Sequence, residues 1–202
     1  MTTSATRLSK RVSWLLRHGA IQSQLAMDAA GWAQIADVTA TLHITEAELA
    51  QAVQLNDKNR LQVNGNRIRA CQGHSLEGMP VTVTALEASW EAIHPSERLW
   101  HGTNIASVEG IAEYGILPGK RSHVHLAPHR DSSVGKRSAV DFLLAVSPDR
   151  LAEEGVGIYR AQNGVILVRH VPAATIVDIH PLSDAGRRYE PDARRLLDLP
   201  AT

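Results

Sequence analysis

The sequence has little of several features that mark particular classes of protein. One of its 202 residues is cysteine, Cys71, which excludes a disulfide within the chain and a zinc site built from cysteines. The 21 basic and 21 acidic side chains balance, so no overall charge points to a nucleic-acid partner. No segment is apolar over the length of a membrane span, and the first 14 residues lack the apolar run of a signal peptide. We therefore expect a soluble cytoplasmic protein without a membrane partner.

Common catalytic and nucleotide-binding motifs are missing as well. The chain contains no GxGxxG, no P-loop sequence, no GxSxG and no internal repeat. These absences remove the common nucleotide-binding and hydrolase interpretations. With 202 residues the chain is long enough to bury a core in one domain or in two small ones.

The first half of the chain predicts three helices followed by a hairpin. Apolar residues at helical spacing mark the first helix, which closes on Arg17-His18-Gly19 with the glycine as its stop signal. A weaker helical pattern covers residues 35–42, and Thr45-Glu46-Ala47-Glu48 is a capping box for the third helix. An Asn-Gly turn joins strands at residues 60–63 and 67–70. This order of elements is that of a winged helix.

Strand alternation predicts two faces of the hairpin. The inward side chains are Leu61, Val63, Ile68 and Ala70. The outward side chains are Arg60, Gln62, Arg67 and Arg69, with Lys58 just before them. A basic ribbon of this kind can track a phosphate backbone, or it can be a strand edge that its charges keep from aggregating. Likewise, Arg17 and His18 can bind a ligand or simply occupy the carboxyl end of a helix, where cations are favoured.

The stretch from Leu99 to Ala127 predicts a strand, a tight turn, a helix, a loop and a second strand. His101 ends the first strand, Gly102 lets the backbone turn closely, and Thr103 or Asn104 stands where a helix N-cap belongs. A helix start, a turning glycine and a basic strand together indicate an anionic ligand.

Alternation in the second strand of this stretch predicts one polar face and one apolar face. Arg121, His123 and His125 share the first, and Val124 and Leu126 share the second. The spacing of the two histidines occurs in some metal sites, but no cluster of Cys, Asp or Glu accompanies them, so we expect no metal. The other interpretation is that both histidines are solvated or bonded to backbone.

The rest of the chain predicts a domain boundary near residues 80–95, inside a segment of connector-like composition. Further elements are expected as strands at residues 142–146, 165–169 and 175–179 and a short helix at residues 148–154. Helices and short strands of this kind fit an α+β domain. The tail from residue 183 has little apolar content, and we expect it to be extended or mobile.

Six segments taken together resemble the RNA 2′-phosphotransferase family, known as the tRNA 2′-phosphotransferases. They follow the order of the family and span residue 8 to about residue 180. The segments are Leu8-Ser9-Lys10 leading to Leu16-Arg17-His18, Asp57-Lys58-Asn59-Arg60, Ile68-Arg69-Ala70 with Gln72-Gly73-His74-Ser75, Trp100-His101-Gly102-Thr103, Arg121-Ser122-His123-Val124-His125-Leu126, and Asn163-Gly164-Val165.

The resemblance implies an α+β protein of two lobes that acts on RNA and NAD. Residues 1–85 would form a winged-helix-like RNA-binding lobe, 86–95 a linker, 96–182 an NAD-binding lobe of the ADP-ribosyltransferase type, and 183–202 a tail. An internal RNA 2′-phosphate would attack the NAD ribose and expel nicotinamide. A neighbouring ribose hydroxyl would then attack the phosphorus, releasing RNA with a 2′-hydroxyl and ADP-ribose 1″,2″-cyclic phosphate. In this role NAD is a co-substrate.

The same resemblance assigns roles to individual residues. The catalytic set would be Arg17, His18, Arg60 and Arg121, with the three arginines clamping the phosphate and the histidine assisting the second step. The cofactor-binding residues would be His101, which bonds the NAD ribose, Gly102, Thr103 and His125. Contacts to the substrate phosphate or RNA would come from Lys58, Arg67 and Arg69, with a contact between the lobes as the alternative for Arg69.

The sequence departs from the family pattern at Ala20, Leu61, Gly119-Lys120 and Gln162, and none of these departures removes a catalytic candidate. Two other functions stay open. One is an ADP-ribosyltransferase that stops after marking a nucleic-acid phosphate, and the other is a non-catalytic RNA-binding protein. A monomer is the default expectation.

Overall fold

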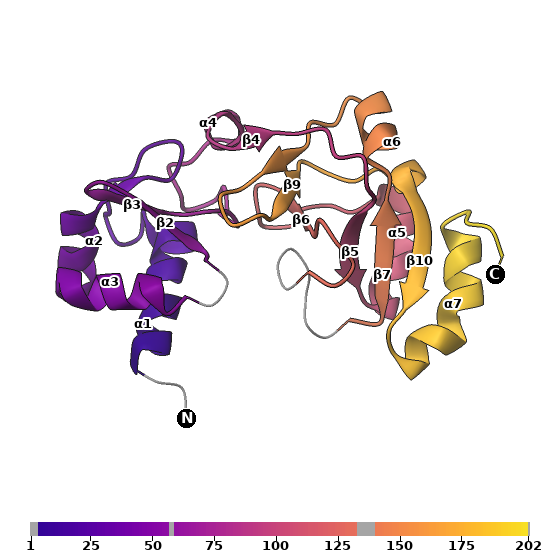
Figure 1. Cartoon of the computed structure of the whole chain (residues 1–202), viewed down its shortest axis with the longest axis horizontal. Coiled ribbons are helices and arrows are strands. Elements are labelled where there is room, and N and C mark those ends of the chain that lie inside the picture. The colour runs from indigo at the N-terminus through magenta and orange to yellow at the C-terminus, as the bar shows by residue number, and fades with distance from the viewer. Residues whose placement is uncertain (1–3, 57–58, 133–139, 202) are drawn as a thin grey trace. The chain divides into compact units, whose positions relative to one another are not determined.

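The computed structural model describes residues 4–56, 59–132 and 140–201 (Figure 1). They divide into two compact units. The first contains the chain up to Glu91 together with Lys120–Ser122 and Ala161–Asn163, and the second contains the remainder. Two short segments from the second half of the sequence thus belong to the first unit. Each unit combines helices with small antiparallel sheets, in agreement with the predicted α+β class.

The helices of the first unit follow the predicted pattern. Helix α1 (Ser4–Trp14) continues into a π-helical turn, η1 (Leu15–Gly19). Helices α2 (Ile35–Leu42) and α3 (Glu46–Gln54) come next, and the predicted capping box is present at the start of α3. Thr45 Oγ1 accepts from the Glu48 backbone N–H at 3.2 Å, while the Glu48 carboxylate accepts from the Thr45 N–H at 2.8 Å. These bonds hold the pKa of Glu48 below its usual range.

A three-stranded sheet of order β1-β3-β2 completes the first unit, with β1 at Ala33–Gln34, β2 at Leu61–Asn64 and β3 at Arg67–Ala70. Helix α4 (Val83–Ala88) lies in the segment expected to be a connector, and buried Leu86 makes it part of the unit. The expectation that both faces of the hairpin alternate in burial is only partly right. Val63 is 47% exposed and Arg69 only 4% exposed.

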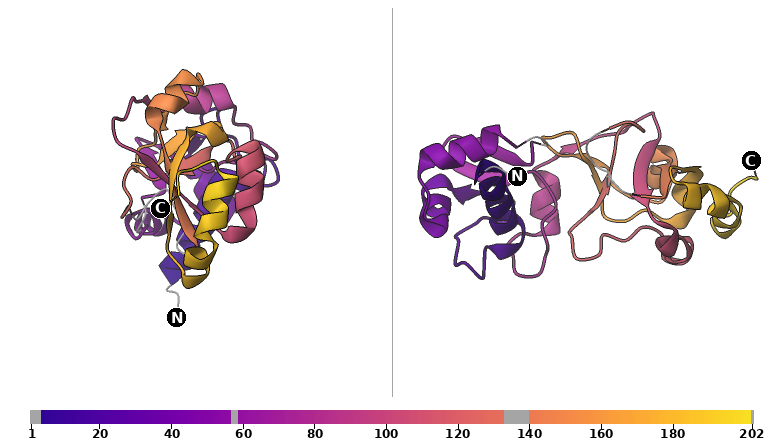
Figure 2. Two further views of the ribbon diagram at one scale, coloured as in Figure 1. Left: turned by 90° about the vertical axis from the view of Figure 1, so that its right-hand side faces the viewer. Right: turned by 90° about the horizontal axis from the view of Figure 1, so that it is seen from below.

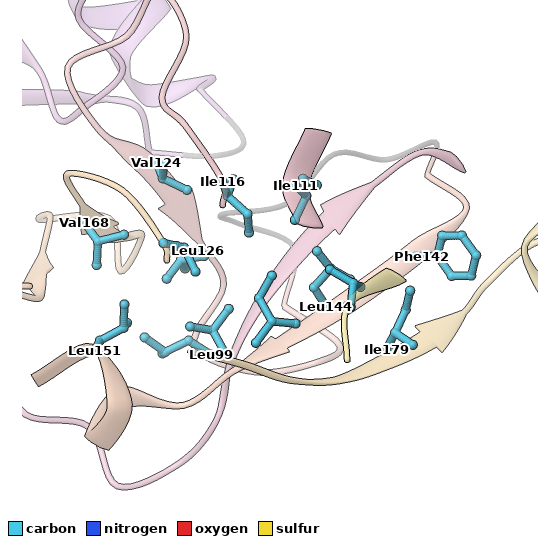
Figure 3. Packing of buried hydrophobic residues seen from close by; sticks show 14 of the residues in the cluster. Leu99, Ile111, Ile116, Val124, Leu126, Phe142, Leu144, Leu151, Val168 and Ile179 are labelled. Atoms are coloured by element: carbon cyan, nitrogen blue, oxygen red, sulfur yellow. The ribbon is translucent and has the colours of Figure 1, made fainter. Parts of the chain in front are cut away.

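The second unit contains two sheets that contribute to one hydrophobic core. A three-stranded sheet has the order β10-β7-β5, with β5 at Leu99–Thr103, β7 at Phe142–Val146 and β10 at Ile176–Pro181. A four-stranded sheet has the order β4-β8-β9-β6. Its strands are β4 (Glu91–Ala92), β8 (Tyr159–Arg160), β9 (Ile166–Val168) and β6 (Val124–Leu126). Figure 3 shows that the core side chains come from both sheets.

Helices pack against these sheets. The chain after β5 passes through a 3₁₀ turn, η2 (Ile105–Ser107), into α5 (Val108–Tyr114), and α6 (Pro148–Glu153) follows β7. A further 3₁₀ turn, η3 (Ala173–Thr175), precedes β10. Helix α7 (Asp184–Leu196), yellow in Figures 1 and 2, contacts both β10 and α5. Among the described residues, no helix is both long and apolar enough to cross a membrane.

The prediction of an extended or mobile tail from residue 183 is wrong, because α7 is a capped and packed helix. Ser183 Oγ accepts from the Gly186 backbone N–H at 2.9 Å and starts the helix. Ala193 and Leu197 belong to the core of the second unit. The side chain of Arg194 is also buried and bonded to acidic groups and carbonyls. A low apolar content therefore concealed a helix whose buried face includes an arginine.

Candidate functional site

Three arginines gather in the first unit. Arg17 lies in the π-helical turn, Arg60 immediately precedes β2, and Arg121 belongs to the short segment that joins this unit from the second half of the chain. Burial lowers the pKa of Arg17 most, and the charges of Arg60 and Arg121 lower it further, to about 10. The positive charges of Arg60 and Arg121 thus lie near enough to the Arg17 guanidinium to disfavour its charge. The sequence-predicted catalytic arginines are therefore brought together.

Arg17 has few protein acceptors for its guanidinium. Its Nη2 donates to Oε1 of Gln72, a neutral group, at 3.4 Å. Its Nε is buried and has no hydrogen-bond partner among the described residues. A buried cation with an unmet donor is costly unless a ligand supplies the missing acceptor. An anion with several oxygens matches both the charge and the donors.

The π-helical turn shapes the backbone at Arg17 and His18. Leu15 and Leu16 are buried and anchor the turn. A Cβ atom at Gly19 would lie 2.4 Å from Cζ3 of the half-exposed Trp14 ring, so a larger residue would have to displace that ring. The helical turn ends at Gly19, as predicted, and the cap residue Ala20 keeps helical dihedral angles. Such turns occur frequently at functional sites.

His18 stands at the exposed edge of the arginine cluster. Its Nδ1 lies 3.3 Å from Ser75 Oγ. Partial burial lowers the pKa of His18 first, and the charges of Arg17 and Arg121 lower it further. The imidazole is therefore neutral at neutral pH unless an anion binds nearby.

The segment Gln72–Ser75 holds this cluster together, a role that sequence reasoning did not assign. Gln72 accepts from Arg17, and the His74 carbonyl accepts from the Ser122 N–H at 2.8 Å. The Ser75 N–H donates to the Arg17 carbonyl at 3.0 Å, and Ser75 also forms an isolated antiparallel bridge with Arg121. The available signal was a run of polar residues placed directly after a strand.

The second unit carries the predicted cofactor residues on and beside β5. His101, Gly102 and Thr103 pair with Leu144, Leu143 and Phe142 of the central strand β7. His101 Nδ1 lies 3.2 Å from the backbone oxygen of His125. Because a carbonyl oxygen can only accept, Nδ1 carries the hydrogen, and Nε2 of the neutral ring is an acceptor.

The helix after β5 begins without the predicted cap. Neither Thr103 nor Asn104 caps it with a side chain; instead Oδ2 of Asp141 accepts from the Ile105 N–H at 3.1 Å. The Ser183 hydroxyl donates to Oδ1 of the same carboxylate at 2.6 Å. Those two bonds, with the serine bond as the larger contribution, hold the pKa of Asp141 below its usual range. Asp141 could not be found from local sequence because it lies just before β7, far along the chain from Ile105.

The predicted polar face of residues 121–125 is divided in the structure. Arg121 belongs to the first unit, whereas His123 and His125 belong to the second. His123 is buried, and His125 is half-buried. Val124 and Leu126 lie in the core, as predicted. In the parts of the chain that the structure describes, no group of three His, Cys, Asp or Glu side chains could hold a metal ion.

The two outward arginines predicted for β3 differ from each other. Arg67 is exposed, and its guanidinium lies 5.3 Å from the Trp32 ring centre and 3.9 Å from the Asp28 carboxylate. Arg69 is buried, 4.7 Å from the same ring centre, so its predicted outward orientation is wrong. Its guanidinium donates to Gln62 Oε1 at 2.8 Å and to Ser89 Oγ at 2.6 Å. The predicted phosphate contact Lys58 lies outside the described residues.

Comparison with known proteins agrees with these features. The model of the RNA 2′-phosphotransferase, Tpt1 / KptA family matches residues 3–170. A Burkholderia lata protein named "Probable RNA 2′-phosphotransferase" is 39% identical over 178 residues, which covers 84% of this chain and 88% of the relative. Proteins of the same name from Agrobacterium fabrum and Acaryochloris marina are 34% and 33% identical, over 83% and 85% of this chain and 91% and 96% of those proteins. The chain is thus a phosphotransferase by class. It belongs to the RNA 2′-phosphotransferase family.

Proposed function

We propose that this protein removes an internal 2′-phosphate from RNA and uses NAD as the co-substrate. The observation that carries the proposal is the cluster of Arg17, Arg60 and Arg121, in which burial and then the neighbouring positive charges lower the pKa of Arg17 to about 10. A phosphate dianion offsets that repulsion and accepts from the unmet Arg17 Nε.

The proposed reaction has two steps. In the first, a 2′-phosphate oxygen bonds to the anomeric carbon of the NAD ribose as the bond to nicotinamide breaks. In the second, the adjacent ribose hydroxyl bonds to phosphorus and the bond from phosphorus to the RNA 2′-oxygen breaks. The products are RNA with a 2′-hydroxyl, nicotinamide and ADP-ribose 1″,2″-cyclic phosphate.

The arginines of the first unit would hold the phosphate in both steps. Charge on the phosphorus oxygens grows in the second step, and preorganised guanidinium groups stabilise such charge without reorganisation. His18 would lie beside the same phosphate and assist the second step. Arg67 would contact flanking RNA, because it is exposed, whereas the buried Arg69 joins the hairpin to Ser89 and Trp32.

His101, Gly102, Thr103 and His125 would bind NAD in the second unit. The contact between His101 Nδ1 and the His125 backbone oxygen holds the imidazole in place on β5, which supports its assignment to the NAD ribose. We assign a winged-helix-like architecture to residues 1–85 and an ADP-ribosyltransferase-like architecture to residues 96–182. The three-stranded sheet next to three helices supports the first assignment.

The test is incubation of the purified protein and NAD with an oligonucleotide that carries one internal 2′-phosphate, followed by mass spectrometry of the RNA and the small molecules. We expect loss of the phosphate from RNA together with nicotinamide and ADP-ribose cyclic phosphate. RNA that only gains an ADP-ribosyl group would make the protein an ADP-ribosyltransferase. RNA binding without consumption of NAD would make it a binding module.

A pair of variants separates catalysis from RNA binding in this experiment. Arg121→Ala should bind the oligonucleotide but turn over little of it, because one phosphate-holding guanidinium is removed. Arg7→Ala is the matched control, since Arg7 is an exposed arginine of α1 outside the cluster. Equal activity of both variants would contradict the proposed site.

A further inference from the structure

Ser75 makes an unusual set of contacts with the π-helical turn. Its N–H donates to the Arg17 carbonyl at 3.0 Å. Its Oγ lies 3.2 Å from that same carbonyl oxygen, 3.0 Å from the Glu77 carbonyl oxygen and 3.3 Å from His18 Nδ1. One side chain therefore contacts the histidine of the proposed catalytic set directly, while its backbone is bonded to Arg17.

The number of available hydrogens decides how these groups are bonded. A serine hydroxyl has one hydrogen, and two of its three neighbours are carbonyl oxygens, which can only accept. The carbonyl oxygens of Glu77 and Arg17, at 3.0 and 3.2 Å, are nearer to Oγ than Nδ1 at 3.3 Å, which favours a hydroxyl hydrogen that points to a carbonyl and lone pairs of Oγ that face His18. Nδ1 must then donate to Oγ.

We propose that Ser75 is a positioning residue that holds neutral His18 in the Nδ1–H tautomer, so that Nε2 presents a lone pair at the edge of the arginine cluster. A bond to Ser75 through Nδ1 leaves Nε2 as the ring atom that can accept a hydrogen. Without the serine oxygen, the ring is free to take either tautomer.

The charge around His18 explains why a serine suits this position. The pKa of His18 is lowered by burial and by Arg17 and Arg121, which keeps the ring neutral. A carboxylate in place of Ser75 would raise that pKa and would also neutralise part of the arginine cluster. The serine selects a tautomer without adding charge, so the positive potential that attracts phosphate is preserved.

A lone pair at Nε2 is matched to a hydroxyl rather than to a phosphate dianion, which has no hydrogen to donate. This part of the inference rests on the proposed function. In the second step, Nε2 takes the proton of the ribose hydroxyl as its oxygen bonds to phosphorus. The bond between phosphorus and the RNA 2′-oxygen breaks, and that oxygen takes a proton from water. The imidazolium returns its proton to the hydroxide so formed.

The tautomer is tested by ¹⁵N NMR of the histidine ring nitrogens in the unliganded protein at a pH where His18 is neutral, with assignment by loss of signals in His18→Asn. We expect the Nδ1–H pattern for His18 in the wild type and in Ser75→Thr, and a mixture in Ser75→Ala. An Nε2–H pattern in the wild type would overturn the proposal. An unchanged pattern in Ser75→Ala would overturn it too.

Kinetics with the 2′-phosphorylated oligonucleotide provide the second measurement. Ser75→Ala should slow the second step by roughly three- to tenfold, the worth of one hydrogen bond, and should accumulate ADP-ribosylated RNA while KM for NAD stays unchanged. Ser75→Thr should restore the rate. The matched control is Ser122→Ala, since the Ser122 hydroxyl is buried without a partner among the described residues.

The two measurements distinguish the possible failures. A wild-type protein that has the Nδ1–H tautomer but never consumes NAD would refute the proposed function alone. Normal phosphate removal with equal second-step rates in Ser75→Ala and the wild type would refute the role of Ser75 alone.

Discussion

Arg17 in the first unit and Arg194 in the second are both withdrawn from water, yet their surroundings are opposite. Arg194 donates to the carboxylates of Glu190 at 2.9 Å and Asp178 at 3.1 Å, and to the carbonyl oxygens of Ile179 and Pro200 at 3.0 and 3.1 Å. Among the described residues, the Arg17 guanidinium donates to one acceptor, the neutral amide of Gln72, at 3.4 Å. After burial, the charges of two further arginines, Arg60 and Arg121, lower the pKa of Arg17.

The difference separates an arginine that stabilises the fold from one that is prepared for a ligand. The acceptors around Arg194 come from α7, β10 and the residues after α7, so its guanidinium ties these parts together. The missing acceptors around Arg17 are the ones that a phosphate group would supply. Arg69 belongs with Arg194, because Gln62 and Ser89 accept from it.

The largest expected effect is the loss of stability on Arg194→Met. This variant keeps most of the apolar stem but leaves the Glu190 carboxylate without its cation. It also takes the Arg194 guanidinium from Asp178, which keeps only Arg98 at 3.6 Å and His180 at 3.3 Å among the described residues. We expect a loss of about 3–5 kcal/mol in the free energy of unfolding, measured with urea. Arg195→Met is the matched control, since Arg195 is 79% exposed and should change stability by less than about 0.5 kcal/mol. Equal effects would show that the buried network contributes nothing.

Arg17→Met should give the reverse result. Stability should stay the same or rise, since a repelled cation is removed and the stem is kept. Phosphate removal from RNA should fall by roughly 10²–10³-fold, the range for one preorganised donor. Arg7→Met is the exposed control on α1. A loss of stability comparable with that of Arg194→Met would make Arg17 a structural residue.

Inorganic phosphate should stabilise the wild type through the same cluster. At about 100 times its dissociation constant, phosphate should add about 2.7 kcal/mol to the free energy of unfolding. Arg17→Met should lose most of this increment, whereas Arg194→Met should keep it despite its lower starting stability. The measurement is thermal unfolding with chloride at matched ionic strength as the control. If Arg17→Met keeps the increase in the free energy of unfolding that phosphate causes, the anion binds at another site.

Phosphate should also change the protonation of His18. In the free protein its pKa is lowered, so the unfolded chain binds more protons near pH 6 and stability rises with pH through that range. A bound dianion favours the imidazolium and should raise the pKa of His18. Phosphate affinity should therefore increase as the pH falls through this range. An NMR titration of His18 with and without phosphate checks the sign, and a further decrease in pKa would contradict it.

The smallest effect is expected for Arg67→Ala. Its ion pair with Asp28 is exposed, with 44% and 47% of the two side chains accessible, so stability should change by less than about 0.5 kcal/mol. The Asp28 carboxylate keeps its bonds to the Ala30 and Trp32 N–H groups. If Arg67 contacts an RNA phosphate, the slope of log affinity against log salt should fall by about one. An unchanged slope would remove Arg67 from the RNA surface.

Local pattern predicted the elements that local interactions specify. The capping box at Thr45, the hairpin and the helix at residues 35–42 were confirmed, because capping, turn chemistry and periodicity act within a few residues. Helix α7 was missed because its buried face depends on Arg194, whose partners include Asp178 on β10. A prediction from composition expects an arginine to be exposed to solvent. Arg194 can be buried because acceptors far from it in the sequence bond to its guanidinium.

The sequence by itself determined which residue types are present for the chemistry: the arginines, the histidines and Gly102. The turn predicted at Gly102 is wrong, because β5 continues through it to Thr103 and pairs with β7. Only the tertiary structure decided which of them act together. It joined Arg121 to Arg17 through the bridge to Ser75, buried Arg69 against Ser89, and replaced the expected N-cap at Asn104 with Asp141. The physical reason is that a charge or a donor takes its role from the acceptors around it, and those acceptors come from distant parts of the chain.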